Sequence, residues 1–518
     1  MSDTDAMPEF GKIRKFFFPI YGFEVKKALP MGLMFFFILF NYTCLRNMKD
    51  AMVVTAPNSG AEVLPFLKAL LVMPSAVLFT LLYAKGSDVM SNENLFYVTI
   101  GFFVAFFGIF GFVIYPHLDF FHPAVDTVAR WQNSCSGSIR WLLAIFGNWS
   151  FALFFVMAEL WGSATLSLLF WQFANQICKT SEAKRFYSFF GLLAQFSLLL
   201  AGEVADHFSK ISLSAPKGVD PWAISLRWLM GIVVVSGIVL MGIYRWIYKY
   251  VLTDKRFYDK PELPGAKKKK AKMGFWQSMI FMVTSPYLGL IAALVICYGI
   301  GVNVIEGLWK GQVKLLHSNP NAFNAFMGRY SFYTGIASMI VMVIGGNILR
   351  KFSWFTAAAI TPTLTLVAGS IFFSFIIWRN DFISVLAQIG TNPIAAAVFI
   401  GAVILILAKA TKYALFDLTK EMAYIPLDDE MKVKGKVVVE VIGGRLGKAS
   451  GAWLQAGLLM IFGMNIFSHG KKVELISLAP YLFGILVTIC LLWILAVRAL
   501  SKKIAAVTTT TPKPVVSE

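Results

Sequence analysis

The sequence is poor in charge. Lysine, arginine, aspartate and glutamate make up 14% of its 518 residues, whereas 58% are hydrophobic. A soluble globular chain has about 25% charged and about 45–50% apolar residues. The mean hydropathy of +0.68 points in the same direction. This composition excludes an ordinary soluble protein and predicts a membrane protein.

Cysteine and histidine are also scarce. The chain has five cysteines and five histidines, which are scattered and include no Cys-x-x-Cys pair. This spacing indicates neither a disulfide framework nor a zinc site. No arrangement typical of a catalytic triad is present either. We therefore expect no metal and no cofactor.

A phosphate-binding loop is missing, although one stretch comes close to it. The stretch GGRLGKASG contains Gly447 and Lys448, but a P-loop needs a glycine where Ile442 stands. It also needs serine or threonine, which would hold Mg²⁺, where Ala449 stands. The mismatch argues against a membrane enzyme that hydrolyses nucleotides.

Long apolar runs are abundant, and crossing a bilayer takes about 20 residues. They predict an all-α polytopic membrane protein with about twelve transmembrane helices. The first 20 residues show no small-residue cleavage site, so we expect the first run to be retained as a helix. The expected spans are residues 30–56, 64–82, 95–115, 149–173, 186–201, 226–247, 286–308, 330–349, 355–378, 394–416, 437–461 and 478–497.

A basic segment divides the expected spans into two equal sets. This layout predicts a major-facilitator-like fold with two pseudo-symmetric six-helix halves. The basic loops all fall on one side if both termini are cytoplasmic. The predicted parts are a cytoplasmic segment (1–29), the N-terminal half (30–248), a basic cytoplasmic linker (249–275), the C-terminal half (276–500) and a disordered cytoplasmic tail (501–518).

The net charge of +19 has a simple cause in this arrangement. Basic loops on the cytoplasmic side contact anionic lipid headgroups. Nucleic-acid binding would need a basic soluble face, and the sequence predicts none. The lipid bilayer is therefore the expected partner of these charges.

Several ionisable residues lie inside the apolar spans. Arg46 and Lys49 interrupt the first span, Glu159 lies near the middle of the fourth, and Glu306 lies in the seventh. A charge at the bilayer centre costs roughly 2.5–3.5 kcal/mol, so such residues usually face a cavity or each other. The alternatives are snorkelling to the interface, a structural ion pair, and an interfacial i,i+4 pair between Glu306 and Lys310.

The tenth span ends in a stripe of basic and aromatic residues. Lys409, Tyr413, Phe416 and Lys420 recur at three- and four-residue spacing on one helix face. The two aromatic rings could stack on a nucleobase. The alternative is a set of side chains that snorkel to the inner interface.

The eleventh span contains Arg445 and Lys448, one helical turn apart. Two cations within a span need an anion, which is either a protein carboxylate or a bound ligand. Together with Arg46 and Lys49 they outnumber the two glutamates. A pocket with this balance suits a multiply charged organic anion, because lysine and arginine bind phosphate well.

Six stretches resemble the non-mitochondrial nucleotide transporters, the ATP/ADP translocases of plastids and obligate intracellular bacteria, and most of all the chlamydial type. The resemblance implies that Lys49, Glu159, Glu306 and Lys448 are essential for transport. The stretches are LPMGLMFFFILFNYTCLRNMKDAMVV, SGAEVLPFLK, AELWGSATLSLLFWQFANQI, EAKRFYSFFG, KATKYALFDLTKEMAYIPLD and KVKGKVVVEVIGGRLGKASG.

The resemblance implies a secondary-active transporter that exchanges ATP for ADP by alternating access. The alternative is proton-coupled import of nucleoside triphosphates. Expected partners are nucleotides, with phosphate or protons as co-substrates. The implied location is a bacterial cytoplasmic (inner) membrane, and the implied assembly is a monomer. The predicted substrate-binding residues are Arg46, Lys49, Glu159, Glu306, Tyr413, Phe416, Arg445 and Lys448.

Overall fold

The computed structural model describes most of the chain, and every regular element in the described residues is a helix. The predicted N-terminal segment, basic linker and tail lie partly outside these residues, as does the start of the predicted span 437–461. The described residues are 20–135, 137–178, 180–211, 218–254, 257, 285–427, 439, 443–463 and 473–510.

The helices before the basic linker form one group, which we call the N-terminal group. Its elements are η1 (Gly22–Glu24), α2 (Val25–Thr55), α3 (Val63–Phe66), η2 (Leu67–Val72), α4 (Met73–Val89), α5 (Asn92–Ile109), η3 (Phe110–Ile114), η4 (Tyr115–His117), α6 (Leu118–Phe121), α7 (Val125–Ser134), α8 (Ile139–Gly147), α9 (Trp149–Trp161), η5 (Gly162–Phe170), α10 (Trp171–Ile177), α11 (Thr180–Ile211) and α12 (Pro221–Tyr250).

The helices after the linker form the C-terminal group. Its elements are α14 (Pro286–Leu316), α15 (Pro320–Lys351), α16 (Trp354–Ile377), α17 (Ile383–Gln388), α18 (Pro393–Thr411), η7 (Lys412–Phe416), α19 (Asp417–Tyr424), α21 (Gly444–Gly463), η9 (Leu475–Leu478) and α23 (Ala479–Thr510).

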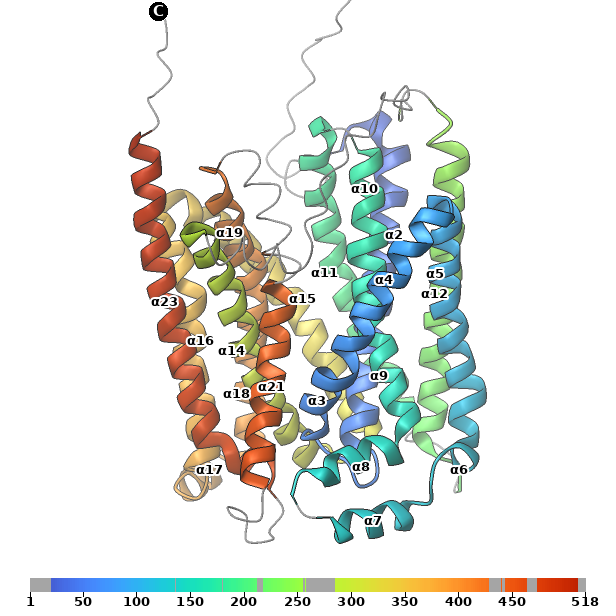
Figure 1. The fold of residues 1–518 in the computed structure, drawn as a ribbon, viewed down its shortest axis with the longest axis vertical. Coiled ribbons are helices and arrows are strands. Elements are labelled where there is room, and N and C mark those ends of the chain that lie inside the picture. The colour runs from blue at the N-terminus through green and yellow to red at the C-terminus, as the bar shows by residue number, and fades with distance from the viewer. Residues whose placement is uncertain are drawn as a thin grey trace, which may run out of the picture.

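The two groups stand side by side with their long helices roughly parallel (Figure 1). The beginning of α2 and the end of α23 lie at the same end of the bundle, which we call the terminal end. The short helices α7 and α8 lie across the opposite, distal end. Chain ends on one side fit the predicted even number of crossings.

Several long helices begin at the same local sequence signal. Asp220, Ser285, Asn319 and Asn392 each accept a backbone N–H of the following turn, and a proline comes next in the chain. Such a residue caps the free N–H groups of a helix, and proline at the first position costs no hydrogen bond. These signals explain why α12, α14, α15 and α18 begin where they do.

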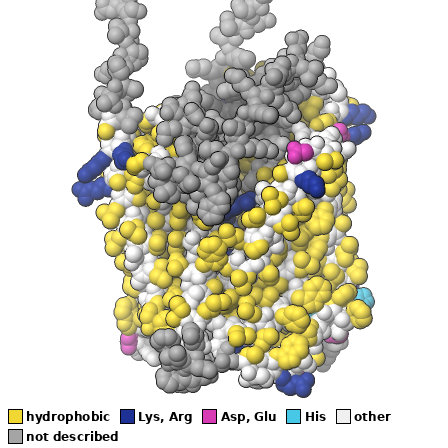
Figure 2. Space-filling model, in the orientation of Figure 1, with side chains coloured by type: hydrophobic (Ala, Val, Ile, Leu, Met, Phe, Trp, Pro, Cys, Tyr) yellow, Lys and Arg dark blue, Asp and Glu magenta, His cyan; other side chains and the backbone are white. Residues whose placement is uncertain are grey.

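Eleven helices among the described residues are long and apolar enough to cross a membrane. The prediction of an all-α polytopic membrane protein is therefore confirmed. The helix α21 is a further long helix, with two cations near its start, and is not one of the eleven. Figure 2 shows hydrophobic side chains over the middle of the visible face, with most charged side chains toward its two ends. This distribution matches a bilayer-embedded belt.

The two groups contact each other closely along α11 and α15. An added Cβ on Gly202 would lie 2.6 Å from the carbonyl oxygen of Gly328, and one on Gly328 would lie 2.7 Å from that of Gly202. Small residues allow this approach, as is common between membrane helices. The contact fixes the groups to each other and brings the charged faces of α2 and α14 close together.

Candidate functional site

Five charged side chains join the two groups in a continuous ion-pair network. The Lys49 ammonium on α2 lies 3.0 Å from the Glu159 carboxylate on α9 and 2.9 Å from the carboxylate of its neighbour Asp50. Asp50 also lies 2.8 Å from Lys310 on α14. Lys310 pairs in turn with Glu306, one turn earlier, at 3.2 Å. Asp50 is therefore the link between the N-terminal and C-terminal groups.

The central residues of this network are buried, and the residues at its two ends are partly exposed. The side chains of Lys49, Asp50 and Lys310 are 2%, 0% and 2% exposed. Those of Glu159 and Glu306 are 26% and 18% exposed. The buried central ions satisfy each other, as buried charges must. The two glutamates are the members that a ligand can reach.

Three further cations lie beside the network. They are Arg46 on α2, Lys68 on η2 and Lys409 on α18, and we call them the cation cluster. None lies within 4.0 Å of a carboxylate among the described residues, yet the charges of all three act on Glu306. The field in this region is therefore positive. A carboxylate shared among so many cations cannot neutralise them.

Lys448 approaches the network from α21. Its side chain is exposed, and its charge acts on Glu159. The glycines around it serve helix packing, because an added Cβ on Gly299 of α14 would lie 2.7 Å from the backbone of Gly447. The Gly-rich stretch is therefore a place where two helices touch and present a lysine.

Arg445 is placed differently from Lys448. Its side chain is exposed, and none of the described contacts joins it to the ion-pair network or to the cation cluster. Its part in a binding site stays a prediction. The other charged candidates (Arg46, Lys49, Glu159, Glu306 and Lys448) do converge between the two groups.

The two aromatic candidates also have different surroundings. Phe416 is buried, stacks on Tyr298 with ring centroids 5.2 Å apart, and meets Trp493 edge-on at 5.6 Å. Tyr413 is 40% exposed and lies under the Lys412 ammonium at 4.9 Å. Of the two rings, Tyr413 is the one with a free surface for a base.

The network and the cation cluster contain residues that were not among the predicted site residues. The sequence indicates Lys310 only as an i,i+4 partner of Glu306 and does not indicate that Asp50 and Lys310 connect the two groups, because only the fold brings them together. Lys68 was missed altogether. It interrupts the apolar stretch VLPFLKALLV, so the rule that singled out Glu159 would have found it.

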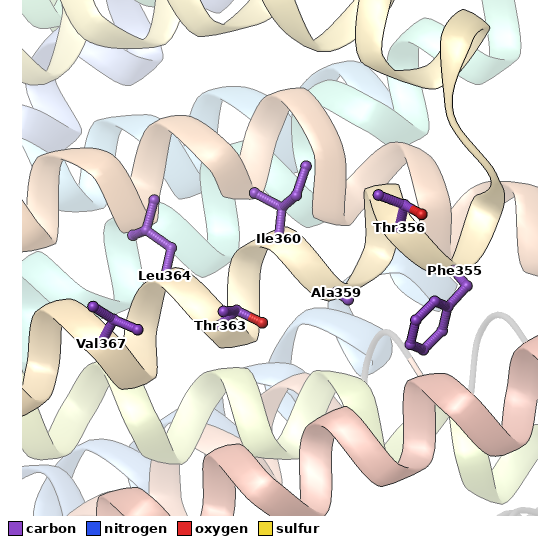
Figure 3. Close-up of a pocket in the computed structure, with 7 residues that line it drawn as sticks. All are labelled: Phe355, Thr356, Ala359, Ile360, Thr363, Leu364 and Val367. Carbon is purple, nitrogen blue, oxygen red and sulfur yellow. The ribbon is translucent and has the colours of Figure 1, made fainter.

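The described residues include no group of His, Cys, Asp and Glu side chains able to hold a metal ion. A groove on the surface, about 490 Å³ in volume, runs along α16 (Figure 3). Its lining is apolar apart from two threonines and includes Phe355, Ile360 and Leu364. A polyanion would find no cation there. The charged region between the groups is the chemically suited site.

Comparison with protein families gives a match over nearly the whole chain. The family model described as TLC ATP/ADP transporter matches residues 3–504. The ADP,ATP carrier protein 1 of Chlamydia pneumoniae is 49% identical over 97% of this chain and 96% of its own. That of Rickettsia bellii is 43% identical over 99% and 100%. The chloroplastic carrier of Arabidopsis thaliana is 43% identical over 93% and 75%.

Solved structures show the same fold at low sequence identity. A bacterial homologue of the iron transporter ferroportin aligns with a TM-score of 0.57 at 15% identity, over 93% of this chain and 100% of that one. A D-xylose–proton symporter aligns with a TM-score of 0.53 at 13% identity, over 90% and 96%. The predicted major-facilitator-like fold is confirmed.

Proposed function

The chain belongs to the TLC ATP/ADP transporter family, and on this premise we propose that it exchanges ATP for ADP across a membrane. The chain is a transporter rather than an enzyme. In the proposed mechanism, the two helix groups expose the charged site between them to each side in turn, as a secondary-active exchanger does.

The observation that carries this proposal is the excess of cations between the groups. Arg46, Lys68, Lys409 and Lys448 have no carboxylate partner within 4.0 Å among the described residues. Uncompensated charges inside a protein cost several kcal/mol each. A nucleotide with a diphosphate or triphosphate supplies the missing negative charge and forms charge-assisted hydrogen bonds.

Each predicted site residue has a role in this proposal. Lys49 and Lys448 bind phosphate oxygens. Glu159 and Glu306 hold the lysines in place while the site is empty and release them when nucleotide arrives. Arg46 adds a third cation to the phosphates, and Tyr413 offers a ring to the base. Phe416 packs against Tyr298 and Trp493 in the core, and Arg445 contributes long-range positive charge.

The position of the contacts between the groups fits alternating access. Towards the distal end, Arg329 pairs with Asp206 at 3.2 Å, and the Glu62 carboxylate accepts the N–H of Leu475 at 3.0 Å. Lys314 also donates to the carbonyl of Ser59 there. We propose that these contacts form a shut gate at the distal end. They must break before the site can open there.

The orientation follows from the basic residues. We propose that the terminal end faces the cytoplasm of a bacterium across its inner membrane, because arginine and lysine gather at that end. Examples are Arg350 and Lys351 in the last turn of α15, and Arg498 twelve residues before the last residue of α23. Positive residues favour the cytoplasmic side. We further propose that the carrier works as a monomer.

The test is nucleotide exchange in proteoliposomes that contain the purified full-length protein. Uptake of labelled ATP is expected only when the vesicles hold ADP or ATP, and Lys49→Ala is expected to abolish it. The matched control is Lys85→Gln, at an exposed lysine on α4. Uptake into empty vesicles that depends on a pH gradient would replace exchange with proton-coupled import.

A further inference from the structure

Glu306 is the carboxylate around which most cations gather. Lys310 forms an ion pair with it, whereas the charges of Arg46, Lys68 and Lys409 act on it without a direct pair. These cations come from α14, α2, η2 and α18, and therefore from both helix groups. The ion pair with Lys310 already uses much of the negative charge of Glu306. The cation cluster is left without a counter-charge.

The present contacts of the cation cluster are with neutral groups. The Lys68 ammonium donates to the amide oxygen of Asn303 across the group boundary at 2.9 Å. The Lys409 ammonium lies 4.8 Å from the ring centroid of Tyr330. The Arg46 guanidinium reaches the Ser331 hydroxyl at 3.5 Å. Each of these contacts can be exchanged for a phosphate oxygen without breaking an ion pair.

We propose that Arg46, Lys68 and Lys409 form a second phosphate subsite of the carrier, apart from the site of Lys49 and Lys448 beside Glu159. The inference rests on the proposed function and assigns Lys68 and Lys409 to the binding of the polyphosphate chain. A guanidinium and two ammonium groups from different helices suit the oxygens of one phosphate group.

The position of Lys68 connects this subsite to the first one. Its charge acts on both Glu159 and Glu306, and its ammonium donates to Asn303 of the C-terminal group, so it lies near both glutamates. A chain of two or three phosphates reaches from the first subsite, beside Glu159, to the second subsite, beside Glu306. A single phosphate occupies only one subsite. The carrier therefore selects its substrate by the number of phosphate groups. Nucleoside monophosphates leave the cation cluster unneutralised.

The experiment measures the Kd of inorganic tripolyphosphate, AMP and ATP on the purified full-length protein. In Lys68→Gln and Lys409→Gln, the Kd for tripolyphosphate and ATP is expected to rise roughly tenfold or more, the loss of one charged hydrogen-bond partner. The Kd for AMP is expected to stay near the wild-type value. Lys68→Arg and Lys409→Arg are expected to restore binding, and Lys85→Gln to leave it unchanged.

Three results would overturn the subsite. The first is that both folded glutamine variants bind tripolyphosphate with wild-type affinity. The second is that these variants lose AMP binding and tripolyphosphate binding equally. The third is that tripolyphosphate fails to compete with ATP for the wild-type protein. The competition experiment needs no variant, so it tests the subsite even if a glutamine variant does not fold.

The exchange assay separates this inference from the proposed function. If wild-type protein exchanges nucleotides while both glutamine variants bind tripolyphosphate normally, the subsite is wrong and the function stands. If the binding pattern is as expected and no ATP/ADP exchange occurs, the function is wrong and the subsite stands.

Discussion

Asp50 is the residue through which the ion-pair network links the two helix groups. It is fully buried and pairs with Lys49 at 2.9 Å and with Lys310 at 2.8 Å. Removing one partner of a buried ion pair leaves an uncompensated charge and costs about 3–5 kcal/mol. Here two lysines would lose the same partner, and each keeps one glutamate.

Asp50→Asn is therefore expected to lower the free energy of unfolding in detergent by about 3–5 kcal/mol. The amide keeps the shape of the side chain and removes only its charge. Asp88→Asn, at an exposed position on α4, is the matched control and should change little. Equal stability of the two variants would show that Asp50 does not hold the groups together.

We expect Glu159 to affect the conformational change of the transport cycle more than the binding of nucleotide. In Glu159→Gln, Lys49 keeps Asp50 as a partner and loses one carboxylate that competes with phosphate. The expected result is nucleotide binding within about a factor of ten of wild type, the worth of one modest charged contact, together with loss of exchange. Filter binding and proteoliposome exchange on the same preparation measure the two effects. Normal exchange would make Glu159 purely structural.

The charged residues were predictable from the sequence because each lies in an otherwise apolar span. Lys49, Glu159 and Glu306 stand in apolar spans, so the cost of burying a charge marks them without any fold. Their partners could not be predicted, because Lys310 and Asp50 lie 260 positions apart in the chain. The pairing follows from the packing of α2 beside α14.

At the scale of helices, α2 and α14 are equivalent elements of the two groups. Each has 31 residues, and Lys49 and Lys310 hold the same position, six residues before the last residue of their helix. The two lysines then share Asp50. This equivalence supports the predicted pseudo-symmetry. The division into two halves remains a prediction, because helix positions alone do not test its boundaries.

The contact between α11 and α15 depends on the absence of side chains. A Cβ on Gly202 would approach the backbone of Gly328 to 2.6 Å, and neither backbone can yield cheaply. Gly202→Ala is expected to reduce the free energy of unfolding by about 1–3 kcal/mol, as overpacking does. The matched control is Gly191→Ala on the same helix, where an added Cβ meets nothing within 4 Å.

Chemical denaturation of both variants in the same detergent makes the comparison. An alanine at position 191 should be neutral or slightly stabilising, because alanine favours a helix over glycine by about 1 kcal/mol. If both alanine variants keep wild-type stability, the close approach of α11 and α15 does not contribute to the fold.

The irregular parts of the helices were beyond prediction. The spans themselves follow from apolar length. The helix at Pro286 begins where the span was predicted, whereas the helices at Pro221 and Pro320 begin 5 and 10 residues before the predicted starts at 226 and 330. The π-helical segments η2, η5 and η7 do not follow from apolar length. The segment η2 contains Lys68, η5 begins three residues after Glu159, and η7 begins three residues after Lys409. Such segments frequently lie at functional sites, and they form where tertiary packing outweighs local preference.

At the scale of the whole molecule, the described polar contacts between the groups lie mainly towards the distal end. Asp206 with Arg329 and Glu62 with Leu475 are examples, and Ser138 on the α7–α8 connection donates to the carbonyl of Leu459 on α21. The spans and the excess of cations are predictable from the sequence. The concentration of these contacts at the distal end is not predictable from the sequence, because it depends on the conformational state of the two groups.

The excess of cations also gives a physical reason for strict exchange. When the site is empty and both ends close, the unpaired cations lose water without gaining a partner, at a cost of several kcal/mol each. A polyphosphate removes that cost, so the loaded carrier crosses and the empty one does not. Wild-type protein should therefore release labelled nucleotide only when nucleotide is present outside.

Asn303→Asp tests this mechanism with a single added charge. The Asn303 amide oxygen already accepts from the Lys68 ammonium at 2.9 Å, so a carboxylate there neutralises a cation with almost no change of shape. Nucleotide binding should weaken roughly tenfold, because Lys68 is occupied. Efflux of labelled ATP from proteoliposomes into nucleotide-free buffer should rise relative to efflux into ADP, since the empty site now closes at lower cost. Asn94→Asp, exposed on α5, controls for the added charge itself. If Asn303→Asp keeps the wild-type ratio of the two efflux rates, or if wild-type efflux is equally fast without external nucleotide, cation excess does not enforce exchange.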